Sequence, residues 1–283
     1  MFQKSILKNG IRLVTQKLES TKSITVLILV AAGSRYETRE INGISHFLEH
    51  MFFKGAEKYR NAREVSEAID SIGGDFNAFT GKEYVGYYVK ASAEHADTVY
   101  DVLSDMLLKA KFDPAEIDKE RGVIMEEYHM YLDTPMHQIG WDFERLIYGD
   151  QPMGWDQVGT EDVIRRVTQA DFQKYKNDLY VPSNIVISVA GALDHAEVAK
   201  NMEQYFGSLA EQKKAYEHVP LQAYINPKRI YLRTKKTEQS HICVGFPMVA
   251  EPAKDYWAAK VTGVILGGGM SSRMFMSVRE EKG

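Results

Sequence analysis

The chain has 283 residues, of which 44% are hydrophobic and 26% are charged, and its formal net charge is −4. These values are typical of a globular chain with one large domain or two, and the mild negative charge argues against nucleic acid as a main partner. The single cysteine excludes a disulfide framework within the chain and fits a reducing compartment.

The N-terminal region gives no sign of export or membrane insertion. The longest apolar run, Ile24 to Ala32, is too short to span a bilayer and is typical of a buried strand. The first five residues have neither a signal-peptide core nor the character of a transit segment. We therefore expect a cytoplasmic protein that does not bind membranes.

Strands and helices are predicted in a mixed order along the first two hundred residues. Strands are expected at 12–16, 24–32, 75–80, 84–91 and 184–191, and helices at 44–53, 62–72, 93–108, 114–131, 137–146 and 169–179. This order, with its hairpin-like strand pairs, predicts an α+β fold in which helices flank a mixed or antiparallel sheet.

The helix expected at 44–53 contains the strongest functional signal, the sequence H-F-L-E-H at 46–50. In a helix, His46 and His50 lie one turn apart on one face and can converge on a single metal ion. Glu49 lies on the same side, next to the ion but not bound to it. Two imidazoles and a free carboxylate form half of a catalytic zinc site, with ligands and a general base.

The alternative is that the two histidines form a surface pair or a hydrogen-bonded core pair, which is common for histidines in helices. The flanking residues argue against it, because the stretch is apolar on most sides and would bury both imidazoles and Glu49. Burial of these groups without a compensating charge is costly, and a divalent cation supplies that charge.

A third ligand is expected in the helix at 114–131. On a helical wheel Glu120 and Glu127 lie beside the apolar stripe and point inward, whereas Glu126 lies on the opposite, solvated face. Both inward glutamates are therefore candidates, although they could instead pair with arginine or lysine. Cys243 lies in a stretch typical of a strand and is expected to be a small core residue.

Together, H-x-x-E-H at 46–50 and E-R-x-V-x-x-E-E at 120–127 resemble the motifs of the pitrilysin family, the inverzincin zinc peptidases. Within that family, the chain resembles the bacterial processing-protease and mitochondrial processing peptidase-like members. The resemblance implies a Zn²⁺ cofactor and one role for each polar residue. The implied zinc ligands are His46, His50 and Glu127, with Glu49 as the catalytic base and Glu120 as a supporting residue.

The strand expected at 75–80 is a candidate for substrate binding. A strand edge near a metal can bind an extended peptide by adding it to the sheet. The resemblance places Asn77 and Ala78 in the family's substrate-contacting strand. The alternative is an ordinary edge strand in which Asn77 caps a turn.

The C-terminal part of the chain resembles its beginning. Residues 230–238 align with residues 11–19, which suggests a duplicated domain, and the second copy has no ligands where the first has its histidines. A stretch rich in Lys, Glu, Gln and Pro separates the two copies. We expect a catalytic domain at 1–209, a linker at 210–228, and the start of a second, non-catalytic domain at 229–283.

The second copy is too short to complete a domain, so the chain is expected to be a fragment whose second half could come from a homodimer or a partner chain. The predicted function is a zinc-dependent endopeptidase that cleaves unfolded proteins or short peptides. One alternative is a non-catalytic structural or assembly subunit of the same fold, against which the intact ligands argue. A metal-binding protein without hydrolytic activity is a further alternative, and Glu49 argues against it.

Overall fold

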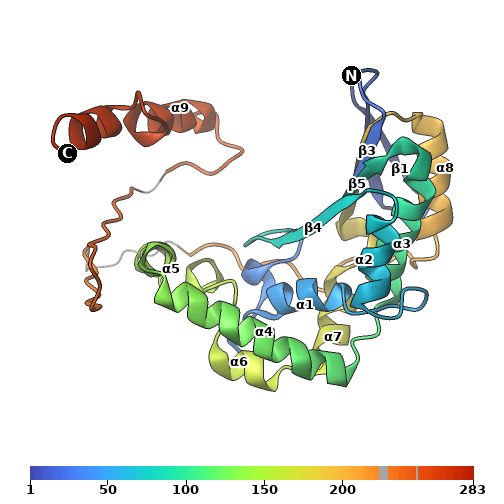
Figure 1. The fold of residues 1–283 in the computed structure, drawn as a ribbon, viewed down its shortest axis with the longest axis horizontal. Helices are drawn as coiled ribbons and strands as arrows, with labels where there is room; N and C mark the ends of the chain where they lie inside the picture. Colours follow the sequence, from blue (N-terminus) through green and yellow to red (C-terminus); the bar gives the residue numbers. More distant parts are fainter. Residues whose placement is uncertain (223–228, 247) are drawn as a thin grey trace. The chain divides into compact units, whose positions relative to one another are not determined.

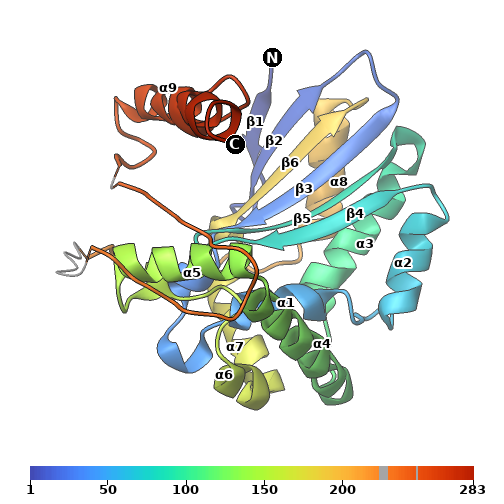
Figure 2. The same cartoon turned by 60° about the vertical axis from the view of Figure 1, so that its left-hand side comes forward.

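Six strands form one sheet, which lies beside helices α2, α3 and α8 (Figure 1). The strand order is β1-β2-β6-β3-β5-β4 (Figure 2). The strands are β1 (Gln3–Ile6), β2 (Arg12–Lys17), β3 (Ser23–Val30), β4 (Asp75–Thr80), β5 (Val85–Ser92) and β6 (Ile185–Gly191). β2 and β6 run parallel, and the other neighbouring strands in this sheet run antiparallel. The predicted α+β fold with a mixed sheet is therefore confirmed, and β4 lies at one edge.

The structure is a computed structural model that describes residues 1–222, 229–246 and 248–283. Its contacts divide the chain into two compact units, Met1–His241 and Ile242–Gly283. Residues 223–228 of the predicted linker lie outside the described residues.

Eight α-helices are found in the described part of the first unit. They are α1 (Ile44–Phe52), α2 (Ala62–Asp70), α3 (Ala96–Lys109), α4 (Pro114–Asp133), α5 (Pro135–Tyr148), α6 (Glu161–Arg166), α7 (Gln169–Leu179) and α8 (His195–Phe206). The predicted helices are all present, with ends that differ by a few residues. β1, α6 and α8 were not predicted; β1 and α6 are too short to show a clear period.

One face of the sheet is buried, and every second side chain of a strand lies on that face because successive side chains point to opposite sides. In β3 every second residue, from Ile24 to Val30, is buried, and the residues between them are half-buried. Helices α3 and α8 pack on the buried face (Figure 2). The register of the sheet is thus fixed by which side chains reach this core.

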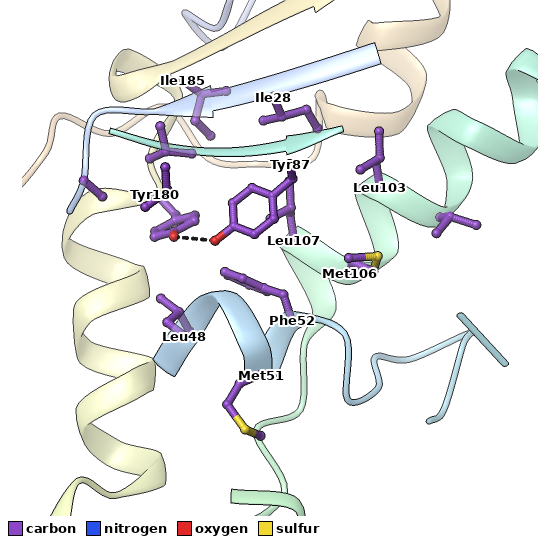
Figure 3. Packing of buried hydrophobic residues seen from close by; sticks show 14 of the residues in the cluster. Ile28, Leu48, Met51, Phe52, Tyr87, Leu103, Met106, Leu107, Tyr180 and Ile185 are labelled. Carbon is purple, nitrogen blue, oxygen red and sulfur yellow. Dashed lines mark hydrogen bonds between the residues drawn. The ribbon is translucent and has the colours of Figure 1, made fainter. Parts of the chain in front are cut away.

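The core beneath the sheet also holds the histidine helix α1 in place (Figure 3). Leu48 and Phe52 of α1 are fully buried, and the Phe52 ring packs edge-on against Tyr87 of β5, with ring centroids 5.3 Å apart. Above them the hydroxyl groups of Tyr87 and Tyr180 form a buried hydrogen bond of 2.8 Å. The apolar side of α1 therefore faces the core, and its polar side faces away from it.

The second unit contains helix α9 (Tyr256–Gly267) and a π-helix at Phe275–Glu280. The predictions that Cys243 lies in a strand and belongs to the core are wrong. The described residues from 229 to 246 contain no strand, and Cys243 is exposed. A β-strand needs a neighbouring strand to accept its backbone hydrogen bonds, and the described residues of this segment have none. Within the described residues, no helix is long and apolar enough to cross a membrane.

The hydrogen bond between Tyr87 and Tyr180 predicts a specific pattern of stability. Either tyrosine changed alone to phenylalanine leaves one buried hydroxyl without its partner and should lower the free energy of unfolding by about 1–3 kcal/mol. The double variant removes both hydroxyls and should lose clearly less than the sum of the two single losses. Urea unfolding of the four proteins measures this, and strictly additive losses would contradict the pairing.

Candidate metal centre

Helix α1 presents His46 and His50 on the side away from the core. Their rings lie edge to face, with centroids 4.7 Å apart, as expected for residues one turn apart. Each side chain is largely buried, with exposed fractions of 13% for His46 and 22% for His50. The predicted helical arrangement of the motif is therefore present.

Helix α4 packs against α1 and brings two glutamates to the histidines. Nε2 of His46 lies 3.6 Å from Oε1 of Glu127, and Nε2 of His50 lies 3.6 Å from Oε2 of the same carboxylate. Glu120 lies deeper, and Glu126 is exposed, as the helical wheel predicted. Glu127 thus faces both imidazoles at once.

The spacing of these groups fits a metal ion better than direct hydrogen bonds. One ligand atom from each of His46, His50 and Glu127 can be chosen so that all lie within 4.8 Å of one another. Ligand atoms about 2.1 Å from a tetrahedral zinc lie roughly 3.4 Å from one another, close to the 3.6 Å between each imidazole Nε2 and one oxygen of the Glu127 carboxylate. Two imidazoles and a carboxylate are also a donor set that zinc prefers.

Two charged side chains, those of Glu120 and Lys54, orient the imidazole of His50. Nδ1 of His50 lies 2.8 Å from Oε1 of Glu120, and Nζ of Lys54 lies 2.6 Å from Oε2. Burial acts to raise the pKa of Glu120, but the hydrogen bonds from His50 and Lys54 outweigh it and hold the pKa below its ordinary value. The ionised carboxylate keeps the proton of His50 on Nδ1 and leaves Nε2 free to bind a metal.

Glu127 is also ionised in this site. His46 lowers the pKa of the Glu127 carboxyl, burial opposes this effect, and His50 and the hydroxyl of Tyr131 lower the pKa further. A carboxylate that is half-buried and ionised is suited to bind a cation.

Glu49 lies beside these groups without belonging to them. Its Oε2 accepts a hydrogen bond from the hydroxyl of Thr80, at the end of the edge strand β4. No hydrogen bond to its other oxygen, Oε1, is found among the described residues. The carboxylate is therefore held at one oxygen and open at the other.

The predicted substrate residues lie on this same edge strand. Asn77 is exposed and Ala78 half-buried, and the side-chain oxygen of Asn77 accepts a 2.8 Å hydrogen bond from the backbone N–H of Ala78. Helix α1 packs against β4, and Thr80 touches Glu49, so the strand runs beside the candidate site.

Sequence reasoning missed Lys54, Thr80 and Tyr131 as parts of this site. Lys54 follows His50 by four positions, a spacing that could have placed it near the same helix face. Thr80 reaches Glu49 through the packing of β4 on α1, and Tyr131 follows Glu127 by four positions on α4.

Comparison with known proteins gives matches over most of the chain. The insulinase family, peptidase family M16, matches residues 12–146, and the M16 inactive domain matches residues 166–283. The uncharacterized zinc protease YmxG of Bacillus subtilis is 40% identical over 283 residues, which are 100% of this chain and 68% of that protein. An uncharacterized zinc protease of Streptomyces coelicolor is 35% identical, over 99% of this chain and 62% of its own length.

Among solved structures, a protease from Helicobacter pylori has the same fold, with a TM-score of 0.84 and 24% identity. The match covers 100% of this chain and 69% of that protein. The chain therefore spans about two thirds of the length of these proteins. Because the inactive-domain match begins at residue 166 and the contacts divide the chain after His241, the domain limits inferred from the sequence stay a prediction.

The opposite orientations of Glu126 and Glu127 predict different effects on metal binding. Glu127→Gln removes a charged candidate ligand and should abolish stoichiometric zinc binding, whereas Glu126→Gln changes an exposed side chain and should leave it intact. Zinc content of the two purified variants, measured by elemental analysis, checks this. Equal zinc in both proteins would show that Glu127 is not a ligand.

Proposed function

The chain belongs to the M16 (insulinase) family of zinc peptidases, and from this premise we propose that it hydrolyses peptide bonds. In this proposal His46, His50 and Glu127 bind Zn²⁺, and Glu49 is the general base. The observation that carries it is the convergence of the three ligand groups beside a carboxylate that is not one of them.

Zinc bound to these residues would polarise the scissile carbonyl and make the attacking water more acidic. Glu49 accepts a proton from that water through its open oxygen Oε1 and then delivers the proton to the leaving amine. Thr80 fixes the other oxygen, Oε2, and so limits the positions that the base can adopt. Glu120 holds the imidazole of His50 in the tautomer that presents Nε2.

The proposed substrate is an unfolded or short peptide, since such a chain can pair in extended form with the edge strand β4. Asn77 and Ala78 lie on that strand, next to the helix that carries the base. The outward N–H of Ala78 is occupied by the side chain of Asn77, so a peptide that binds there must first displace this hydrogen bond. Asn77 would then be free to contact the peptide itself.

A non-catalytic subunit of the same fold is less well supported, because a protein without hydrolytic activity has no need of a base beside the three ligands. The cytoplasmic location, the absence of nucleic acid and membrane partners, and the homodimer or partner chain stay predictions from the sequence.

The role of Glu49 predicts that metal binding and hydrolysis can be separated. Glu49→Gln should keep its zinc, because the residue is not a ligand, but should lose peptide hydrolysis by at least ~10³-fold through lost proton transfer and water activation. The test uses a fluorogenic peptide with zinc-loaded protein, and chelation followed by zinc addition shows that the activity needs the metal.

Glu126→Gln is the matched control, because it makes the same chemical change at an exposed position of α4. It should retain both zinc and activity. Hydrolysis by Glu49→Gln close to that of this control would show that another group is the base.

A further inference from the structure

We infer that Glu37, which lies outside both sequence motifs, is a positioning residue for the metal centre, because its buried carboxylate caps the helix that carries both histidines. The inference rests on the proposed zinc site and concerns how His46 is held in it. Glu37 precedes α1 in the chain and is only 2% exposed.

The carboxylate of Glu37 accepts hydrogen bonds from the beginning of α1. Its Oε2 accepts from the backbone N–H of Gly43, at 2.7 Å, and from the side-chain amide of Asn42, at 2.9 Å. Its Oε1 accepts from the backbone N–H of Ser45, also at 2.9 Å. The first N–H groups of a helix have no partner within the helix, so this carboxylate supplies one from outside.

Helix α1 cannot supply this cap from its own N-cap residue. That residue is Gly43, with φ at 99°, and a Cβ atom at this position would lie 2.4 Å from the carbonyl oxygen of Val158. A serine or aspartate, the usual capping residues, would therefore clash there. The hydroxyl group of Ser45, in the first turn of the helix, forms a hydrogen bond of 2.7 Å with the hydroxyl group of Tyr175.

Glu37 has no Lys or Arg ion partner among the described residues, so it is stabilised by the donors at the helix start and by the positive end of the helix dipole. Burial of a carboxylate without a cation is costly unless its hydrogen bonds are strong. Burial raises the pKa of the Glu37 carboxyl, and the hydrogen bonds from Asn42, Gly43 and Ser45 act against that rise. The carboxyl group and the start of α1 therefore hold each other in place.

The two histidines differ in what holds them. The ring of His50 is oriented by Glu120, whereas Nδ1 of His46 is buried and has no hydrogen-bond partner among the described residues. Since His46 directly follows Ser45 in the first turn, its place in the site is set mainly by the backbone there. Loss of the Glu37 cap should loosen this turn and move the first zinc ligand.

The experiment compares Glu37→Gln with Asp105→Asn, a matched control. Asp105 is also a buried carboxylate that accepts two backbone N–H groups, from Lys58 at 2.9 Å and from Tyr59 at 3.0 Å, and neither is in α1 or α4. Both substitutions keep the side-chain size, remove the charge and should lower the melting temperature.

Zinc dissociation constants are then measured by competition with a chromophoric chelator, at a temperature at which circular dichroism shows each protein to be folded. Glu37→Gln should raise the dissociation constant by roughly 10-fold, as is typical when an outer hydrogen bond of a metal site is lost. Asp105→Asn should leave it within about 2-fold of the unchanged protein, since its hydrogen bonds involve neither ligand helix.

An unchanged zinc affinity in Glu37→Gln, or an equal loss in both variants, would overturn the inference. If Glu37→Gln does not fold, Asn42→Ala replaces it in the test, because it removes one hydrogen-bond donor to the same carboxylate. Asn42→Ala should raise the zinc dissociation constant about 3-fold, which is less than the effect of losing the whole cap. An unchanged zinc affinity in Asn42→Ala would then overturn the inference. Failure of the unchanged chain to bind zinc would instead refute the proposed function.

Discussion

The packing of α4 on α1 is the constraint on which the rest of the site depends. It places the carboxylates of Glu120 and Glu127 against two imidazoles that lie one turn apart. With Glu49, the two helices bring together one buried and two half-buried carboxylates, and among the described residues the ammonium of Lys54 pairs with that of Glu120. Such an excess of negative charge is unfavourable in a protein interior, and a divalent cation relieves it.

The sheet and the core beneath it position α1 from the side opposite to the candidate metal site. Leu48 and Phe52 fix the helix against the core beneath Tyr87, so the histidines point away from the sheet. The edge strand β4 runs beside the same helix and reaches Glu49 through Thr80. The metal ligands, the base and an edge that can pair with a peptide thus meet at one place, without any large loop to bring them together.

The parts of the site that lie on one helix face could be predicted from the sequence, because helical geometry alone determines them. This holds for the two histidines and for the contrast between Glu126 and Glu127. The contacts of Glu37 and Thr80 could not be predicted, since they join segments that meet only through tertiary packing. The strand expected at Cys243 failed for a related reason: its apolar pattern fits a strand, but a strand forms only where another strand is present to pair with it.

The two histidines, although they belong to one motif, are held by different means. His50 is held by the carboxylate of Glu120, which also pairs with Lys54, so the position of His50 depends on α4. His46 is fixed through the backbone of the first turn, which depends on the buried carboxylate of Glu37. Glycine is required at position 43 because the chain at Val158 passes too close for a side chain, and this close approach removes the usual place for a helix cap. The close packing of the site helix therefore explains why its cap must come from a residue outside the helix.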